Sequence, residues 1–248
     1  MVTNRKDLIR SLLEAIATGE SETIAVVDED INTPRNPQLD QNRERLAAPS
    51  EPLAASPAKA HIARVFEDGD FVFAHTTYDF PERTVAFEVF RFEGDRVIEH
   101  KANRQALQAP NPSGHSMVDG EIRIRELEKT ESNRELVRAF VEDVLIQRKG
   151  EKIYDYVKWN HYVEHNPRGN DDLDLIIAIV TSSGADAADS VVYEKCHRVL
   201  VEGNFVLSIC EGRVGHAPAT FYDLWCLEHD YIVEHWDTTE TSAVVTDP

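Results

Sequence analysis

Two ionisable side chains lie near the end of the sequence at a spacing that suits acid–base chemistry. Residues 231–237 have the pattern of a β-strand, in which successive side chains point to opposite faces. His235 and Asp237 therefore share one face, while Glu234 and Trp236 share the other. A carboxylate can act as a general base, and a histidine can orient it or donate a hydrogen bond. This face of the strand is a candidate catalytic surface.

A further acid, Asp223, stands on the strand expected just before this one. Asp223 shares its face with Phe221 and Trp225, so pairing of the two strands would bring both acids to one cavity. Acid–base chemistry requires an ionised base and a neighbouring group that donates a hydrogen bond. Desolvation in an apolar pocket is expected to raise the pKa of Asp237 towards a useful range. The expected catalytic residues are Asp237, His235 and Asp223, and Phe221 and Trp225 are expected to bind the substrate or to belong to the core.

A third group of candidates precedes Pro167. The residue before a proline is held extended, so the side chain of Asn166 has a fixed direction and can cover the pocket together with His165 and Tyr162. These three residues are expected to bind the substrate. The alternative for the polar candidates is structural: Asn166 forms a turn, and Asp237 accepts hydrogen bonds at a strand end or helix cap.

Four short matches indicate that the chain contains two copies of one pattern. Their offset rises slowly from 130 residues (166 minus 36) to 135 residues (235 minus 100), as a few loop insertions would produce. They pair residues 36–37 with 166–167, 64–65 with 198–199, 67–72 with 201–206, and 99–100 with 234–235. A repeat of this length predicts two domains of similar fold.

The length of 248 residues also suits two domains of about 100 to 150 residues each. We expect a first domain at residues 1–108, a linker at 109–129 that begins with Pro, Gly and Asn, and a second domain at 130–248. Each half has helical patterns followed by strand patterns, which predicts an α+β fold with an antiparallel sheet.

The elements expected in each half follow from apolar periodicity and turn residues. In the first half we expect helices at 6–16 and 21–27, broken helix and loop at 32–57, and strands at 60–67, 71–78, 84–92 and 97–103. In the second half we expect a helix ending at Gly150, helices at 153–159 and 171–182, and strands at 191–201, 204–212, 219–227 and 231–238. Ser132 and Glu135 have the spacing of a capping box. Residues 118–128 are expected to form an extra strand or an extended tether.

Composition argues against several classes of function. The chain has 45 acidic and 26 basic residues, a net charge of -19 that opposes binding to nucleic-acid phosphates and anionic membranes. No apolar run approaches the roughly 20 residues that span a membrane, and the start lacks a signal-peptide core, so a cytoplasmic location is expected. The ten histidines are scattered and the three cysteines lack ligand spacing, so no metal site is expected.

The second half resembles the SnoaL-like polyketide cyclases and aldol-condensation enzymes of the NTF2-like, or ketosteroid-isomerase-like, superfamily. The resemblance covers residues from about 130 to 238 and rests on the motifs YVEHNP at 162–167, HRVLVEGNFV at 197–206, EG at 211–212, FYDL at 221–224 and IVEHWD at 232–237. It implies a cone-shaped α+β barrel whose open mouth holds the ligand. It also implies that an aspartate near the end of the last strand, here Asp237, removes the proton. Where the cyclases have a histidine on the preceding strand this chain has Asp223, so the substrate stays open.

The first half resembles the same domain in a more divergent form. Lys101 and Ala102 replace Trp236 and Asp237, so no base can be assigned there. This half is expected to have a degenerate pocket and to form an intrachain pseudo-dimer with the second, because single domains of the family pair through their sheets.

Two classes of function therefore stay open. One is a cofactor-independent enzyme that removes a proton next to a carbonyl of a small apolar or polyketide-like compound, as a cyclase, isomerase or aldol-type lyase. The other is a non-catalytic binding module for an apolar small molecule, or a tandem scaffold for assembly. The expected ligand of the enzyme or of the binding module is an apolar small molecule, whereas the scaffold would have no ligand. Neither nucleic acid nor membrane is an expected partner, and homo-oligomerisation is open.

Overall fold

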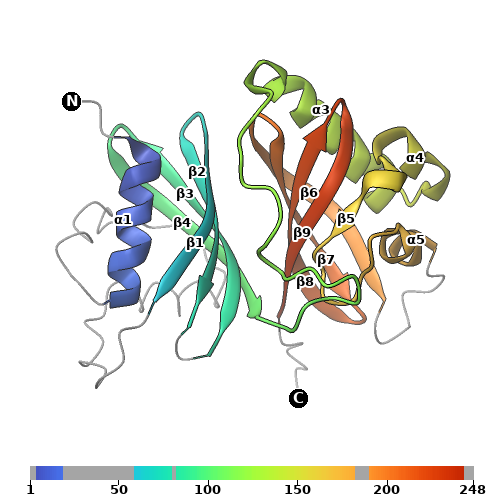
Figure 1. Cartoon of the computed structure of the whole chain (residues 1–248), viewed down its shortest axis with the longest axis horizontal. Helices are drawn as coiled ribbons and strands as arrows, with labels where there is room; N and C mark the ends of the chain where they lie inside the picture. Colours follow the sequence, from blue (N-terminus) through green and yellow to red (C-terminus); the bar gives the residue numbers. More distant parts are fainter. Residues whose placement is uncertain (1–3, 19–58, 80–81, 182–189, 243–248) are drawn as a thin grey trace. The chain divides into compact units, whose positions relative to one another are not determined.

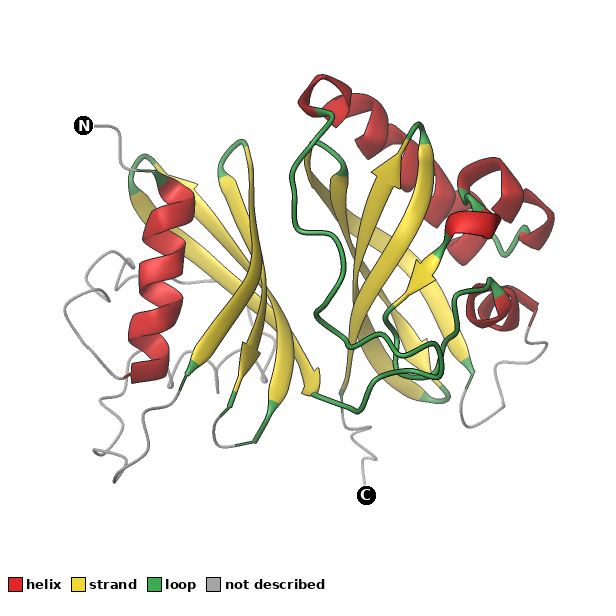
Figure 2. Ribbon diagram, viewed as in Figure 1, coloured by secondary structure: helices red, strands yellow, loops and turns green. Residues whose placement is uncertain are grey.

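The structure, a computed structural model, describes residues 4–18, 59–79, 82–181 and 190–242. The chain divides into two compact units, Met1–Ala102 and Asn103–Pro248. Each unit combines helix with an antiparallel sheet, so the fold is of the mixed α+β class (Figure 1, Figure 2).

The first unit is built from one described helix and a four-stranded sheet in the order β1-β2-β3-β4. The elements are α1 (Arg5–Thr18), β1 (Ala60–Asp68), β2 (Phe71–Tyr78), β3 (Thr84–Glu93) and β4 (Arg96–Ala106), whose last residues pass beyond this unit. Helix α1 lies across one face of the sheet (Figure 2). Its apolar stripe of Ile9, Leu12 and Leu13 is fully buried in a core with β-strand residues such as Val65 and Val72, which is why the helix is held there.

The second unit has a five-stranded sheet in the order β5-β9-β8-β7-β6. Its strands are β5 (Val163–Glu164), β6 (Val191–Glu202), β7 (Phe205–Val214), β8 (Ala217–Glu228) and β9 (Tyr231–Thr241). The strands β6 to β9 pair antiparallel, whereas the two-residue strand β5 adds to β9 in parallel. Because β5 ends the sheet next to β9, it brings the 162–166 segment beside the end of the chain.

The helices of the second unit are α3 (Thr130–Phe140), α4 (Ile153–Tyr156) and α5 (Asp174–Thr181). Helix α3 continues directly into the wider π-helical turn η3 (Val141–Ile146), and the 3₁₀ turns η4 (Gly150–Lys152) and η5 (Trp159–His161) flank α4. All three helices lie on one side of the sheet (Figure 1). Phe140 of the α3 helix packs edge-on against Trp225 of β8 at 5.1 Å, and both residues belong to the buried core between helices and sheet.

Most elements expected from the sequence are confirmed, with ends that differ by a few residues. The strand at Phe71–Tyr78 has the expected bounds, and the helix expected at 171–182 begins later, at Asp174. The helix expected at 153–159 is interrupted after Tyr156, since Val157 adopts an extended conformation. The helix expected at 21–27 and the region 32–57 lie outside the described residues.

The capping box expected at the start of α3 is wrong. The 3₁₀ turn η2 (Leu127–Lys129) leads directly into the helix, so Lys129 rather than Ser132 precedes its first turn. Ser132 lies inside that turn, and its hydroxyl donates to the carbonyl of Lys129 at 2.9 Å. A serine inside a helix can donate in this way to a carbonyl of the preceding turn and does not then cap the helix.

Residues 118–126 form neither strand nor helix, so of the two alternatives expected for this segment the extra strand is wrong and the tether remains. The segment is nevertheless tied to the sheet. The amide of Arg125 donates to Asn204 Oδ1 at 2.7 Å, and the amide of Asn204 donates back to the Arg125 carbonyl at 2.9 Å. Side chains and main chain of the second unit thus take up the hydrogen bonds that a strand partner would have made.

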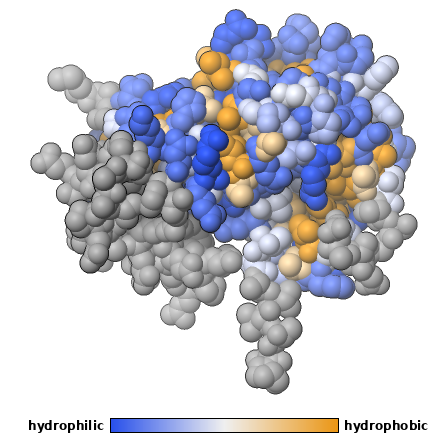
Figure 3. Space-filling view, turned by 60° about the horizontal axis from the view of Figure 1, so that its bottom comes forward, coloured by the Kyte–Doolittle hydropathy of each residue, from blue (hydrophilic) through white to orange (hydrophobic). Residues whose placement is uncertain are grey.

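The surface reflects the acidic composition. In the view of Figure 3 it is mainly hydrophilic, with apolar residues in separate areas. Among the described residues, the exposed large apolar side chains are Ile122, Leu127, Tyr154 and Trp159. No helix in the described ranges is long and apolar enough to cross a membrane.

Candidate active site

The candidate acids meet because of the register between β8 and β9. Asp223 lies directly opposite Asp237, and Trp225 lies directly opposite His235. On the other side of β8, Ser208 of β7 lies opposite Asp223. Since alternate residues of a strand share a face, the acids, His235 and Trp225 all face the helix-covered side of the sheet, where Trp225 contacts α3.

The edge strand β5 adds a further carboxylate. Glu164 pairs in register with His235 and is completely buried. Its Oε2 accepts a hydrogen bond from the Tyr162 hydroxyl at 2.7 Å, and its Oε1 accepts the amides of His165 and Asn166, each at 2.9 Å. Burial raises the pKa of Glu164, but the charge of His235 and these hydrogen bonds outweigh it and hold the pKa below its ordinary value. Glu164 is therefore a buried anion.

His235 is the cation that matches this anion. Its Nδ1 lies 3.0 and 3.2 Å from the two oxygens of Glu164, and its Nε2 lies 3.3 Å from Oδ1 of Asp223. Burial opposes protonation, but Glu164 and the hydrogen bond to Asp223 raise the pKa of His235 well above its ordinary value. With both nitrogens protonated, the ring donates to two carboxylates while it stacks on Trp225 with 4.0 Å between ring centroids.

The pKa of Asp237 suits a general base. Burial raises the pKa of Asp237 to about 6; His235 opposes this rise, while the charges of Glu164 and Asp223 add to it. The amide nitrogen of Asn166 lies 2.9 and 2.8 Å from the two carboxylate oxygens and fixes their direction. The residue retains some exposed surface, unlike Asp223 and Glu164.

Asp223 is almost completely buried and incompletely paired. Its Oδ1 accepts hydrogen bonds from the Tyr193 hydroxyl at 3.0 Å and from His235, whereas its Oδ2 has no hydrogen-bond partner among the described residues. Tyr193 in turn stacks on Phe221 at 4.3 Å. A buried carboxylate oxygen without a partner is costly, and such groups in native structures call for a functional or solvent partner.

The structure brings together seven of the eight residues singled out in the sequence. Those seven are Asp237, His235, Asp223, Asn166, Tyr162, Trp225 and Phe221. The eighth, His165, lies on the other face of β9, where it stacks on Trp236 at 4.7 Å and contacts Glu234 at 2.8 Å. The reason is the alternation of side chains: Glu164 points towards His235, so His165 points away.

Glu164, Tyr193 and Ser208 are members of the group that the sequence analysis did not single out. Ser208 accepts a hydrogen bond from the indole nitrogen of Trp225 at 3.0 Å. For Glu164 the available signal was its position within the YVEHNP motif, two residues before Asn166. Tyr193 stands on β6, two strands away from Asp223, and its long side chain reaches across.

A similar but smaller arrangement occurs within the first unit. His100 lies 2.5 Å from Glu88, stacks on Phe90 with 4.3 Å between ring centroids, and Glu88 also accepts the Tyr78 hydroxyl at 2.8 Å. An acid, a histidine and an aromatic ring thus recur in the same relation. The position two residues after this histidine is Ala102, where the second unit has Asp237.

Comparison with known proteins finds similarity among solved structures. No protein-family model matches the chain, and no curated protein matches it. Among solved structures, the chain is similar to a protein described as a putative ketosteroid isomerase from Kribbella flavida DSM 17836, with 16% sequence identity and a TM-score of 0.37. The match covers 48% of this chain and 85% of that one. A similarity of this size carries no conclusion about the reaction, which has to be argued from the residues.

Proposed function

We propose that the second unit is a cofactor-independent enzyme that removes a proton next to a carbonyl group, with Asp237 as the base. The observation that carries this proposal is the state of that carboxylate: its pKa is raised to about 6, both oxygens are held by Asn166, and it keeps some exposed surface. A general base works best when its pKa lies near the working pH.

The neighbouring residues support such a base in distinct ways. Protonated His235 lies between the carboxylates of Glu164 and Asp223 and holds a positive charge at a fixed position. Glu164 is its buried counterion. We propose that the enolate formed in the reaction is stabilised by this fixed positive charge, which needs no rearrangement during the reaction. The free oxygen of Asp223 is the proposed acceptor for a donor group of the ligand.

The proposed chemical step is balanced without a cofactor. The C–H bond next to the carbonyl breaks, its proton passes to an oxygen of Asp237, and its electron pair forms the C=C bond of an enolate. In an isomerisation the proton returns to another carbon. In a cyclisation or aldol-type reaction the enolate carbon attacks a second carbonyl, and the proton goes to the new alkoxide.

We propose an apolar or polyketide-like substrate, because aromatic side chains lie beside the acids on the same side of the sheet. Phe221, Tyr193 and Trp225 lie on the helix-covered side of the sheet beside Asp223. We also propose the SnoaL-like, NTF2-like assignment for this unit, with a cone-shaped domain whose mouth opens at Asp237. The mainly antiparallel sheet covered by helices on one side, with an acid on its last strand β9, supports it.

A non-catalytic binding module is the alternative, and one observation favours it. The hydroxyl groups of Tyr162 and Tyr193 already donate to Glu164 and Asp223, so neither serves as an oxyanion donor in this arrangement. In this case the same group would bind an apolar ligand with a polar end, without turnover.

Deuterium incorporation from solvent distinguishes the two functions. The full chain is incubated in D₂O with a panel of apolar ketones and β-dicarbonyl compounds, and the products are analysed by mass spectrometry. The proposal predicts exchange with the wild type, loss of exchange with Asp237→Asn, and unchanged exchange with Asp155→Asn, a matched change of an exposed acid on α4. Ligand-induced stabilisation that persists in Asp237→Asn, without exchange by either protein, would establish the binding module instead.

A further inference from the structure

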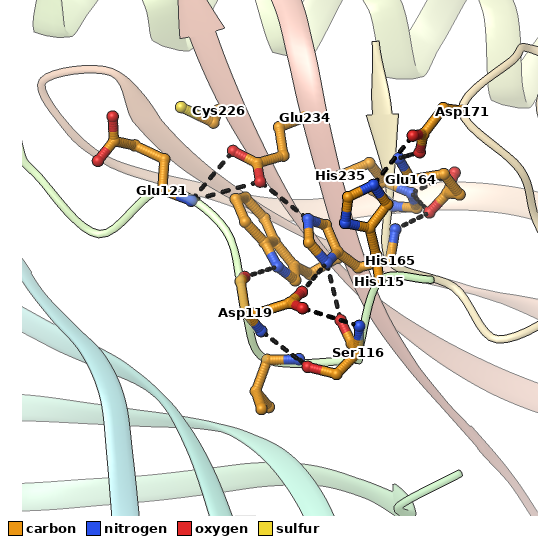
Figure 4. Close-up of polar contacts among 12 residues, drawn as sticks. His115, Ser116, Asp119, Glu121, Glu164, His165, Asp171, Cys226, Glu234 and His235 are labelled. Atoms are coloured by element: carbon orange, nitrogen blue, oxygen red, sulfur yellow. Dashed lines mark hydrogen bonds and ion pairs between the residues drawn. The ribbon is translucent and has the colours of Figure 1, made fainter. Parts of the chain in front are cut away.

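A second cluster of ionisable side chains lies on the opposite side of β9 from Asp237. It consists of His115, Asp119 and His165, whose candidate ligand atoms all lie within 4.8 Å of one another. Figure 4 shows these side chains close together. Two of them come from the segment that precedes η2, and the third follows β5, so the cluster forms only when this segment lies against the sheet.

His165 has the environment of a metal ligand. The ring is buried, and its Nε2 lies 2.8 Å from Oε1 of Glu234. Its other nitrogen, Nδ1, lies 2.8 Å from Oδ1 of Asp119 and 2.7 Å from the carbonyl oxygen of Ser116. Histidines that bind metals characteristically use the second ring nitrogen to contact a carboxylate or carbonyl, which fixes the orientation of the ring.

His115 repeats this arrangement with a different acid. Its Nε2 lies 2.9 Å from Oδ2 of Asp171, and the ring centroid lies 5.3 Å from that of His165. Asp171 is itself oriented, because its Oδ1 accepts the amide of Glu164 at 3.1 Å. Each histidine therefore has a carboxylate at Nε2, which leaves its Nδ1 as the candidate ligand atom.

The third ligand is held in place by its own loop. One oxygen of Asp119 accepts the amide of Ser116 at 3.1 Å, and the amide of Asp119 donates to the Ser116 hydroxyl at 3.1 Å. The other oxygen, Oδ1, faces His165. One carboxylate oxygen is thus directed at the cluster before any ion binds.

Close packing fixes this loop against the sheet. Gly120 adopts a φ of +91°, and a Cβ atom there would lie 2.0 Å from Oε1 of Glu234 and 2.9 Å from His165. The indole nitrogen of Trp236 donates to the carbonyl of Asp119 at 2.9 Å. The ligand residues therefore lie on a rigid support, which is what a preorganised metal site requires.

We propose that His115, Asp119 and His165 bind a divalent transition-metal ion of the zinc class. Two imidazole nitrogens and one carboxylate oxygen suit Zn²⁺, and water or the Ser116 carbonyl completes the coordination. On binding, the ion takes the place of the proton at Nδ1 of His165, and this proton is released to solvent. Residues 115–119 and the segment after β5 both supply ligands, so the bound ion holds residues 115–119 against the sheet.

Metal binding by the full chain tests the site directly. The protein is stripped with a chelator, dialysed against Zn²⁺ or Co²⁺, and analysed for bound metal. We expect about one equivalent in the wild type, with a visible Co²⁺ spectrum that indicates nitrogen and oxygen ligands. Asp119→Asn and His115→Asn should abolish stoichiometric binding, and Asp171→Asn should weaken it by about 10- to 100-fold through the loss of the outer carboxylate.

The controls separate this site from other histidines and from unfolding. His216→Asn changes an exposed histidine in a turn and should leave metal binding unchanged. Circular dichroism of each variant without metal should match that of the wild type. The proposal is overturned if the folded wild type binds no metal, or if stoichiometric binding survives in both Asp119→Asn and His115→Asn.

Discussion

Asp223 and Asp237 lie directly opposite each other on neighbouring strands, and both face the helix-covered side of the sheet. Two carboxylates in this relation would repel each other if nothing separated their charges. His235, two residues before Asp237, donates to Asp223, and Asn166 donates to Asp237. The pair therefore has unequal environments, which is the condition under which neighbouring acids take different roles.

Asp237→Asn should stabilise the protein above pH 6 while it removes the proposed base. The folded state holds the pKa of Asp237 at about 6, above its ordinary value of 3.8, so the folded state binds this proton more tightly than the unfolded state does. Stability from this group is present at low pH and is lost as the pH rises through about 6. The variant has no such pH-dependent loss of stability. Above pH 6 its free energy of unfolding should therefore exceed that of the wild type by at most about 3 kcal/mol, at about 1.4 kcal/mol per pKa unit. Urea unfolding of the variant and the wild type at pH 4 and pH 7.5 measures this difference in stability. An equal difference at the two pH values would contradict this account.

Glu164→Gln should destabilise the second unit strongly. The change keeps the size of the side chain but leaves His235 without its principal counterion inside the protein. Removing one partner of a buried ion pair costs about 3–5 kcal/mol. As a control, Glu194→Gln removes an ion pair with Arg213 whose side chains are 50% and 35% exposed, and it should cost less than about 1 kcal/mol. The free energies of unfolding of both variants provide the test, and similar values would show that the Glu164 pair is not structural.

Asn166→Ala should raise the pKa of Asp237 further. The Asn166 amide contacts both oxygens of this carboxylate and favours its ionised form. Without these hydrogen bonds, less opposes the rise in the pKa of Asp237 that burial causes. Carbonyl-carbon NMR of labelled aspartate, followed through a pH titration, measures the shift. A pKa that stays at the wild-type value would mean that Asn166 does not govern the base.

Gly120→Ala and Gly114→Ala form a matched pair that tests the packing of the linking segment. Both glycines have positive φ, +91° and +95°, so both substitutions carry backbone strain of about 1–3 kcal/mol. Only at Gly120 would the new methyl group clash with Glu234, His165 and Trp236, whereas nothing lies within 4 Å of it at Gly114. Gly120→Ala should therefore lower the melting temperature clearly more than Gly114→Ala. Equal losses would mean that residues 115–121 do not pack against the sheet in solution.

Alternation within strands was the most informative feature of the sequence. It placed His235 and Asp237 on one face, and Asp223, Trp225 and Phe221 on one face of the neighbouring strand, and these predictions are confirmed. The turns between the last strands are short, so neighbours in sequence are also neighbours in the sheet. Register then follows from local pattern.

Contacts between segments that are far apart in the sequence were harder to predict. Glu164 reaches His235 because a two-residue strand pairs in parallel with β9, and so short a strand has no period of its own to detect. The same pairing turns His165 away from the acids, although it stands next to Glu164 in the sequence. The cluster of His115, Asp119 and His165 likewise depends on the path of a segment without regular structure. The domain boundaries and the intrachain pseudo-dimer expected from the sequence stay predictions.

The pH dependence of solvent deuterium exchange tests the central claim most directly. With a ketone that the wild type exchanges, the rate at low substrate concentration should rise with pH and level off above an apparent pKa near 6, since Asp237 must be ionised to accept the proton. This rise should disappear, together with the exchange, in Asp237→Asn. Exchange that keeps the same rate and the same pH dependence in folded Asp237→Asn would contradict the assignment of Asp237 as the base.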